Sequence, residues 1–258
     1  SDGDDFVAWC WKAGGNKGTF NVDGRAYASA AAAGLDGGSI TPSGASVGTK
    51  QGFSILKYSG ASGAKSISHG LSQAPTFIIV KCIAGVASQN WTIYHKDLPT
   101  GDYLKFTTDD KIDYPMFNDS TPNSSTIPLG NDDQVSGSSG TYILYAWHDV
   151  PGLQKFGTYE GNNDADGPFI QLGFRAAVIM AKNIDASDDW VIADTTRSPF
   201  NPQDETLFPN SNNGEDTGSF NIDILSNGFK LRHASTKWNN SHTFVYMAWA
   251  AAPSVDLY

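Results

Sequence analysis

The residues of this chain that could do chemistry are scattered, and their spacing fits few known sites. Gly44–Gly48 matches the G-x-S-x-G pattern of hydrolases, but that motif needs a strand before it and a helix after it. Here Pro42 precedes it, and loop-forming residues surround it. The five histidines show no H-E-x-x-H spacing, and the chain has no C-x-x-C pair of the kind found in zinc sites. These motifs therefore predict no catalytic residue, and we expect no enzyme.

One acidic segment resembles half of a calcium loop. Asn162, Asp164 and Asp166 place oxygen ligands at alternate positions, and Gly167 follows them. This is how an EF-hand loop begins, but such a loop closes with a Glu at its twelfth position, where this chain has Gly173. We interpret the segment as an acidic turn, with a calcium site as the alternative and no other cofactor expected.

Two aromatic residues stand in polar surroundings that are typical of loops. Trp238 lies within Thr-Lys-Trp-Asn-Asn, with Asn239 directly after it, and Tyr114 lies between Asp113 and Pro115. Exposed aromatic rings stack on sugars or anchor protein interfaces. The sequence therefore makes Trp238, Tyr114 and Asn239 candidate ligand-binding residues, and packing of each ring onto its own domain is the alternative.

The dominant pattern of the chain is a long internal repeat. Phe53–Gly60 and Thr141–Trp147 open and close one stretch, and Lys155–Gly161 and Thr243–Trp249 open and close another. The two stretches are offset by about 100 residues, which is longer than the ~20–50 residues of a solenoid unit. The repeat therefore predicts a domain copied in tandem.

Short apolar runs rich in β-branched and aromatic residues alternate with Gly, Asn, Asp and Ser, which favour turns. We expect an all-β protein of two tandem, homologous antiparallel β-sandwich domains packed against each other. The first sandwich is assigned to residues 51–152 and the second to residues 153–258. Phe77–Val80 is continuously apolar, which predicts a central strand buried on both faces.

Residues 1–50 are interpreted as an N-terminal segment. Its Phe6–Cys10 resembles the ends of Thr141–Trp147 and Thr243–Trp249, so it looks like the closing strand of an earlier unit. Either the chain is the C-terminal piece of a longer array, which we favour, or this strand completes a neighbouring sheet, in cis or in another subunit. The rest is a Gly/Ser/Ala-rich link, in which Ala26–Leu35 is a candidate helix and Gly34–Lys50 is expected to be a loop.

The net charge of the chain argues against some classes of binding partner. Acidic residues outnumber basic ones by 27 to 17, which gives a net charge of −10. This balance argues against nucleic acid, whose phosphates need clustered Lys and Arg. No apolar run approaches the ~20 residues that a membrane-spanning helix needs, so no membrane insertion is expected.

Several motifs of this chain together resemble those of a known family: Phe6–Gly15, Asn21–Gly24, Gly52–Ile55, Asp166–Phe169, Gly173–Arg175 and Asn227–Arg232. The sequence is similar to a domain-of-unknown-function family of virion proteins in cyanobacterial and other marine bacteriophages, often found behind a laminin-G or concanavalin-like module. The link at Ala26–Gly44 departs from the family by its length. The resemblance implies a tail fibre or appendage component and brings no catalytic residues with it.

Three functions follow as expectations. The first is a bacteriophage virion structural protein, a tail fibre or appendage module for recognition of the host surface, including its glycans. The second is a capsid decoration protein that binds other virion subunits. The third is a polysaccharide depolymerase. The repeat argues against it, because catalytic acids should recur at matching positions if both copies were active, yet Glu160 aligns with Ser59 and Asp194 with His95. The expected partners are virion subunits, host glycan and further copies of the chain, and the expected location is the virion, assembled in the host cytoplasm.

Overall fold

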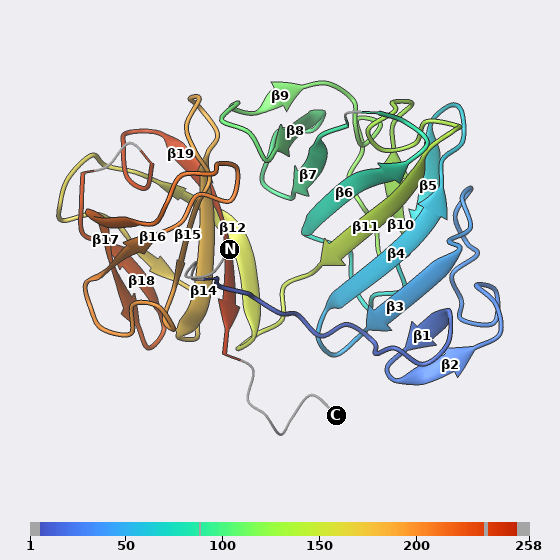
Figure 1. The fold of residues 1–258 in the computed structure, drawn as a ribbon, viewed down its shortest axis with the longest axis horizontal. Helices are drawn as coiled ribbons and strands as arrows, with labels where there is room; N and C mark the ends of the chain where they lie inside the picture. Colours follow the sequence, from blue (N-terminus) through green and yellow to red (C-terminus); the bar gives the residue numbers. More distant parts are fainter. Residues whose placement is uncertain (1–5, 88, 235–236, 252–258) are drawn as a thin grey trace.

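Two β-sandwiches lie side by side in the computed structural model, which describes residues 6–87, 89–234 and 237–251 (Figure 1). The described residues contain no α-helix, and therefore no helix that could cross a membrane. Nearly all strand pairs are antiparallel; β1 and β3 are parallel. The predicted all-β fold with antiparallel sandwiches is confirmed.

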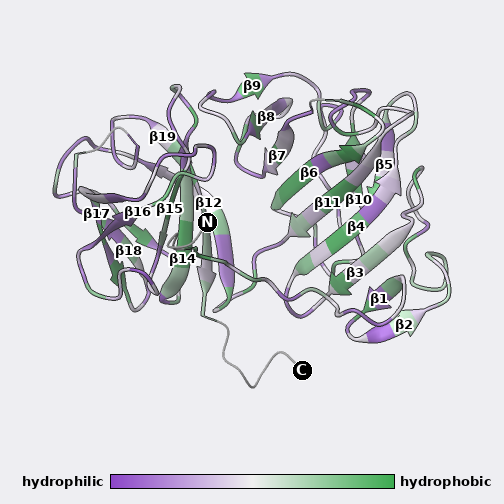
Figure 2. Ribbon diagram, viewed as in Figure 1, coloured by the Kyte–Doolittle hydropathy of each residue, from purple (hydrophilic) through white to green (hydrophobic). Residues whose placement is uncertain are grey.

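The first sandwich contains a large sheet in the order β2-β1-β3-β4-β11-β6-β7-β8-β9 and a small sheet of β5 and β10. Apolar residues dominate β6, the longest of these strands (Figure 2). The strands are β1 (Phe20–Val22), β2 (Arg25–Tyr27), β3 (Gly44–Gly48), β4 (Phe53–Ser59), β5 (Lys65–Ser68), β6 (Phe77–Ala84), β7 (Trp91–His95), β8 (Asp102–Lys105), β9 (Ile112–Asp113), β10 (Thr126–Leu129) and β11 (Thr141–Trp147).

The second sandwich is made of two four-stranded sheets, in the orders β12-β19-β14-β15 and β13-β18-β17-β16. Its strands are β12 (Gln154–Glu160), β13 (Phe169–Gln171), β14 (Ala176–Asn183), β15 (Val191–Asp194), β16 (Gln203–Thr206), β17 (Asp216–Leu225), β18 (Gly228–Leu231) and β19 (Thr243–Ala250).

The two sandwiches share one strand order at their centres. The order β4-β11-β6-β7 in the first sheet corresponds to β12-β19-β14-β15 in the second. The register agrees as well: Trp147 pairs with Phe53 in β4, and Trp249 pairs with Gln154, the first residue of β12. This correspondence is compatible with the predicted duplication and gives each residue of one central sheet a counterpart in the other.

Each sandwich has its own core, because strand residues alternate between two faces. In β11, Tyr142, Leu144 and Ala146 point into the first core. In β19, Phe244 and Tyr246 point into the second. The central strand β6 lies between β11 and β7 and is buried over Phe77–Val80, as predicted from its continuous apolar run.

A third apolar core joins the sandwiches. Phe77 and Trp147 from the first sheet meet Phe156 and Trp249 from the second, with ring centroids 5.5 Å apart for Phe77–Phe156 and 6.3 Å for Trp147–Trp249. The buried amide of Gln154 fixes the connection by donating to the carbonyls of Gln51, Gly52 and His148. The outer faces of the two central sheets are therefore packed against each other.

The N-terminal link is more ordered than the sequence suggested. Gly44–Gly48, expected to be loop, forms β3 because it pairs along β4 as an extra strand. Ser46 of the G-x-S-x-G pattern lies within this strand and donates to the carbonyl of Gly15 at 2.7 Å, so it is not on a nucleophile turn. The candidate helix over Ala26–Leu35 is wrong: the segment holds the end of β2 and then a series of turns.

Candidate functional site

The outer face of the first central sheet is buried at one end and open at the other. Side chains on this face form three rows across β4, β11, β6 and β7, set by the strand registers. Burial decreases from the first row to the third. The rows are Phe53, Trp147, Phe77 and His95; then Ile55, Tyr145, Ile79 and Ile93; then Lys57, Ile143, Lys81 and Trp91.

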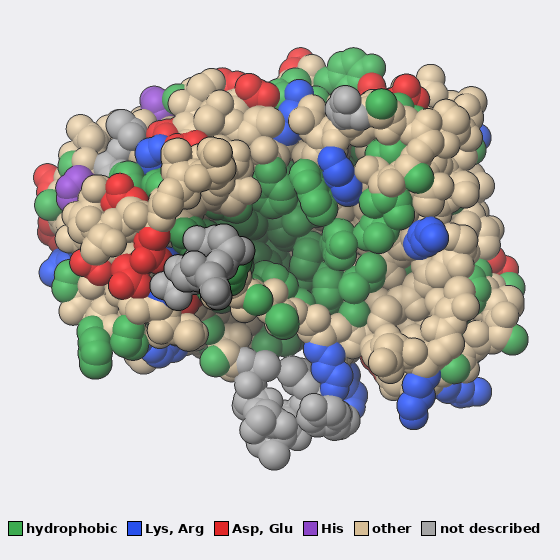
Figure 3. Space-filling model, viewed as in Figure 1, with side chains coloured by type: hydrophobic (Ala, Val, Ile, Leu, Met, Phe, Trp, Pro, Cys, Tyr) green, Lys and Arg blue, Asp and Glu red, His purple; other side chains and the backbone are tan. Residues whose placement is uncertain are grey.

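The open end of this face forms an apolar hollow between the sandwiches. Ile55, Ile143 and Tyr145 are only half-buried. Figure 3 shows hydrophobic side chains gathered where the two halves of the molecule meet. Contiguous exposed apolar patches are rare on monomeric soluble proteins, and larger ones mark interaction sites. We therefore take this hollow as the candidate functional site.

A lysine and a tryptophan lie at the rim of the hollow. Lys81 and Trp91 are paired across β6 and β7, with the Lys81 Nζ 5.5 Å from the ring centroid. Trp91 keeps 39% of its surface exposed. Lys81 donates to the carbonyl of Gln89, and an ammonium group has three donors in all. The pair offers a flat aromatic surface beside a cation, an arrangement suited to binding.

The same pair occurs in the second sandwich, where it is fully covered. Lys182 and Trp190 occupy the counterpart positions, and both are buried. Trp190 Nε1 donates to the Lys105 carbonyl at 2.7 Å, and its ring lies 5.0 Å from that of Phe106. Lys182 Nζ donates to the Thr108 carbonyl at 3.3 Å. In this sandwich the pair therefore binds a loop of the first sandwich through main-chain carbonyls and one aromatic ring.

Burial changes the proton affinity of two groups at this interface. Burial lowers the pKa of Lys182 to about 8, although four aspartates nearby raise it. Burial also lowers the pKa of His95 to about 3. His95 is therefore neutral near pH 7, and it lies 4.0 Å from Asp97 without a charge of its own to pair.

The N-terminal segment reaches the buried end of the hollow. The ring of Trp11 lies 6.4 Å from that of Trp147 and 5.1 Å from that of Trp249, edge-on to both. Trp9 packs against the same core. These contacts hold the segment across the junction of the two sandwiches.

The predicted ligand-binding residues do not come together. Trp238 is 2% exposed and packs in the second core, as in the alternative of packing onto its own domain, so its ring cannot stack on a sugar. Asn239 is buried as well. Tyr114 does lie on the surface, 44% exposed, in the loop after β9. Its role in binding stays a prediction.

The acidic turn at Asn162–Asp166 is organised by protein donors. Asn239 Nδ2 donates to Asn162 Oδ1 at 3.0 Å, and the Asp166 backbone N–H donates to Asp164 Oδ1 at 2.8 Å. Asp166 pairs with Lys230 at 2.9 Å. These oxygens thus accept hydrogen bonds or pair with charges from the protein itself. Among the described residues, no group of three or more His, Cys, Asp or Glu could hold a metal ion.

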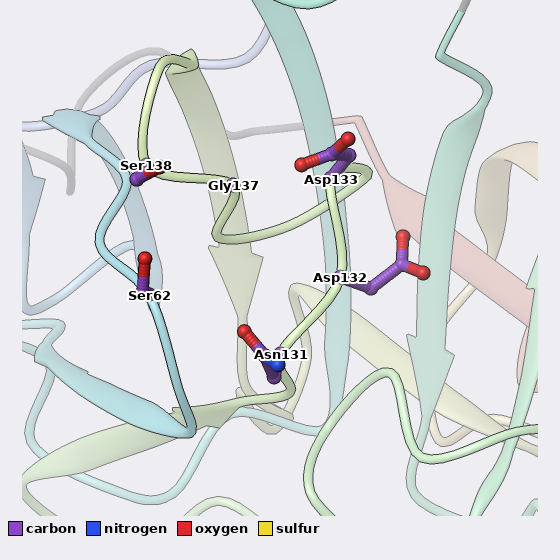
Figure 4. A pocket seen from close by; sticks show the side chains of 6 residues that line it. All are labelled: Ser62, Asn131, Asp132, Asp133, Gly137 and Ser138. Carbon is purple, nitrogen blue, oxygen red and sulfur yellow. The ribbon is translucent and has the colours of Figure 1, made fainter.

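A second hollow lies at the far end of the first sandwich. It has a volume of about 340 Å³ and polar walls that include Ser62, Asn131 and Asp132 (Figure 4). Asn131 Oδ1 already accepts from the Gly63 N–H, and Asp132 Oδ1 accepts from the Gln134 N–H. Because these oxygens serve the local turns, the polar hollow is the weaker candidate.

Sequence reasoning missed the Lys81–Trp91 pair. The signal was present, because Lys81 and Trp91 align with Lys182 and Trp190 in the repeat. What the alignment could not give was their exposure, which depends on how the sandwiches pack.

Comparison with known proteins gives one match. The family profile of a domain of unknown function, DUF7483, matches residues 1–253. The chain belongs to the DUF7483 family. No curated protein and no solved structure matches it. The predicted membership of a family of unknown function is thus confirmed. The description of the DUF7483 family assigns it no activity.

Proposed function

We propose that this DUF7483 protein is a structural component of a bacteriophage virion, a module of a tail fibre or appendage, which binds another protein subunit through the Lys81–Trp91 end of its apolar hollow. The virion context is supported by the sequence resemblance. The binding mode is supported by the buried counterpart pair, Lys182 and Trp190.

The observation that carries this proposal is what Lys182 and Trp190 contact. They hold a polypeptide loop by its carbonyls at Lys105 and Thr108 and by the ring of Phe106. A second pair of the same composition, half-exposed on a related sheet, suits a loop of the same kind. Such a site favours protein over sugar, because its neighbours Ile55, Ile143 and Tyr145 are mostly apolar.

The test combines location with binding. A labelled antibody to this chain, imaged on intact particles, should mark the tail or its appendages. Regular dense labelling of the capsid would favour the decoration alternative instead. The Trp91→Ala chain should fail to be incorporated into assembled particles. The Phe200→Ala chain, which lacks an exposed ring in the second sandwich, should be incorporated normally. Normal incorporation of Trp91→Ala would contradict the binding mode.

A glycan array tests whether the appendage module also recognises glycans of the host surface. The proposal predicts no glycan binding that depends on Trp91. Binding that is lost in Tyr114→Ala but kept in Trp91→Ala would instead assign recognition of sugars to the loop after β9.

A further inference from the structure

The sheet edge formed by β12 has no neighbouring strand among the described residues. β12 is the outermost strand of its sheet, and it pairs with β19 without a break from Gln154 to Glu160. The Phe156 N–H points away from β19, since it donates to Asp149 Oδ1 at 2.9 Å. Backbone groups of paired strands alternate in direction. Those of Thr158 and Glu160 therefore face outward too, and both residues are exposed.

The corresponding edge of the first sandwich is covered. There β3 pairs along β4, with Gly44 opposite Lys57 and Ser46 opposite Ile55. Lys57 is the counterpart of Thr158 in the repeat. An edge with this backbone geometry thus takes an added strand in one sandwich and stays open in the other.

The open edge lacks two of the features that usually prevent strand addition, a bulge and a proline. Natural edges are protected by bulges, prolines or charged side chains. β12 contains no proline and keeps one register with β19. Its charged residues are Lys155, whose Nζ donates to the Gln171 carbonyl of the same sandwich at 2.7 Å, and Glu160. Its unpaired backbone groups are a template for another extended segment.

One segment of this chain has the pattern of a strand and no strand partner in the described structure. Phe6–Cys10 resembles the ends of β11 and β19, yet it forms no ladder. Phe6 is 88% exposed. Within its own chain the segment is held at Trp11 and does not pair with β12. The segment is therefore an unpaired strand, and the β12 edge of the same molecule is an unpaired sheet edge. We call the segment the donor strand and the β12 edge the acceptor edge.

We propose that Phe6–Cys10 of one copy adds as a strand to the β12 edge of a second copy. This is β-strand addition, in which main-chain hydrogen bonds supply much of the binding. Donor and acceptor are different surfaces, so the contact is head-to-tail and builds a ring or an open chain of copies. The inference rests on the edge and the segment alone, and it is independent of the partner bound at Lys81 and Trp91.

The experiment uses the full chain and two sets of proline variants. Thr158→Pro removes an outward N–H from the acceptor, and Glu160→Pro is a second acceptor variant should the first be unstable. Val7→Pro with Ala8→Pro removes an N–H from each side of the donor. Thr158→Ala is the matched control. Circular dichroism and thermal melts confirm that each variant is folded.

Light scattering over a concentration series should show that the unmodified chain and Thr158→Ala associate beyond dimers. Each proline variant alone should remain monomeric. An equal mixture of acceptor-blocked and donor-blocked chains should form a dimer and stop there, because one working donor and one working acceptor remain. A monomeric unmodified chain at all concentrations, or association that survives both kinds of proline, would overturn the proposal.

Discussion

The lysine–tryptophan pair at the β6–β7 hairpin and its counterpart at the β14–β15 hairpin have the same composition but different surroundings. Lys182 and Trp190 are buried against the Lys105–Thr108 loop. Trp91 contacts the same loop at the ring of Phe106, with centroids 6.3 Å apart, but stays 39% exposed beside Lys81 at the edge of the apolar hollow. The difference arises from packing, because the two sheets agree in strand order. Equivalent positions on two sheets of the same strand order can therefore be buried in one sandwich and partly exposed in the other.

The comparison predicts unequal costs for equal truncations. Trp190→Ala removes a fully buried indole and should lower the free energy of unfolding by about 3–5 kcal/mol. Trp91→Ala removes a half-exposed ring and should cost about 1 kcal/mol or less. Urea unfolding of both variants measures the two values. Similar losses would mean that the two tryptophans have similar surroundings, and the hollow would not exist as described.

His95 and Asp194, which occupy counterpart positions, should affect the pH dependence of folding stability differently. Burial lowers the pKa of His95 to about 3 and that of His69 to about 4, so the unfolded chain takes up protons first as the pH falls. The stability that the two neutral histidines contribute is therefore fully present above pH ~6.5. Below that pH the free energy of unfolding falls by up to about 1.4 kcal/mol per pH unit for each histidine. Urea titrations between pH 7 and 4.5 measure this slope.

His95→Gln should reduce that slope by about half, because one of the two histidines is removed. Asp194 acts in a lower range: burial raises its pKa, but hydrogen bonds and charge from Arg197 outweigh this and lower it. Its contribution is present above the carboxyl's ordinary pKa and is lost only as the pH falls further. Asp194→Asn should therefore leave the slope above pH 4.5 unchanged. A slope that does not respond to His95→Gln would contradict the burial of this histidine at the interface.

Proline at counterpart edge positions tests the difference between β4 and β12. Lys57→Pro removes an N–H on the edge that pairs with β3 and should cost about 2 kcal/mol. Thr158→Pro changes an outward N–H and should cost about 1 kcal/mol or less in the monomer. Thermal melts at low protein concentration compare them, with Lys57→Ala and Thr158→Ala as controls. A larger loss at Thr158 would mean that the β12 edge is already paired.

A modest effect is expected at the acidic turn. Asn239→Ala removes the hydrogen bonds that Asn239 makes to Asn162 Oδ1 and the Asp164 carbonyl, and should cost about 1–2 kcal/mol. Calcium should not shift the melting temperature, because the turn's oxygens already accept protein donors. A melt with and without calcium checks this, and stabilisation that disappears in Asp164→Asn would restore the calcium alternative.

Much of the fold follows from the sequence. The continuous apolar run of Phe77–Val80 predicted a buried central strand, and β6 is buried over these residues. Gly44–Gly48 did not read as a strand, because its small residues pair through the backbone and carry little side-chain pattern. Trp238 looked exposed because its sequence neighbours are polar, yet its ring enters the core. Local polarity reports the surroundings of the backbone and does not report where a large side chain points.

The central claim is that two equivalent faces differ in exposure, and thiol labelling tests it most directly. In a Cys10→Ser background, where Cys82 is buried, Ile143→Cys and Val245→Cys place single probes at counterpart positions of β11 and β19. The account predicts that Ile143→Cys reacts rapidly in the native protein, whereas Val245→Cys reacts only at the rate of unfolding. Equal labelling rates at the two positions would contradict it.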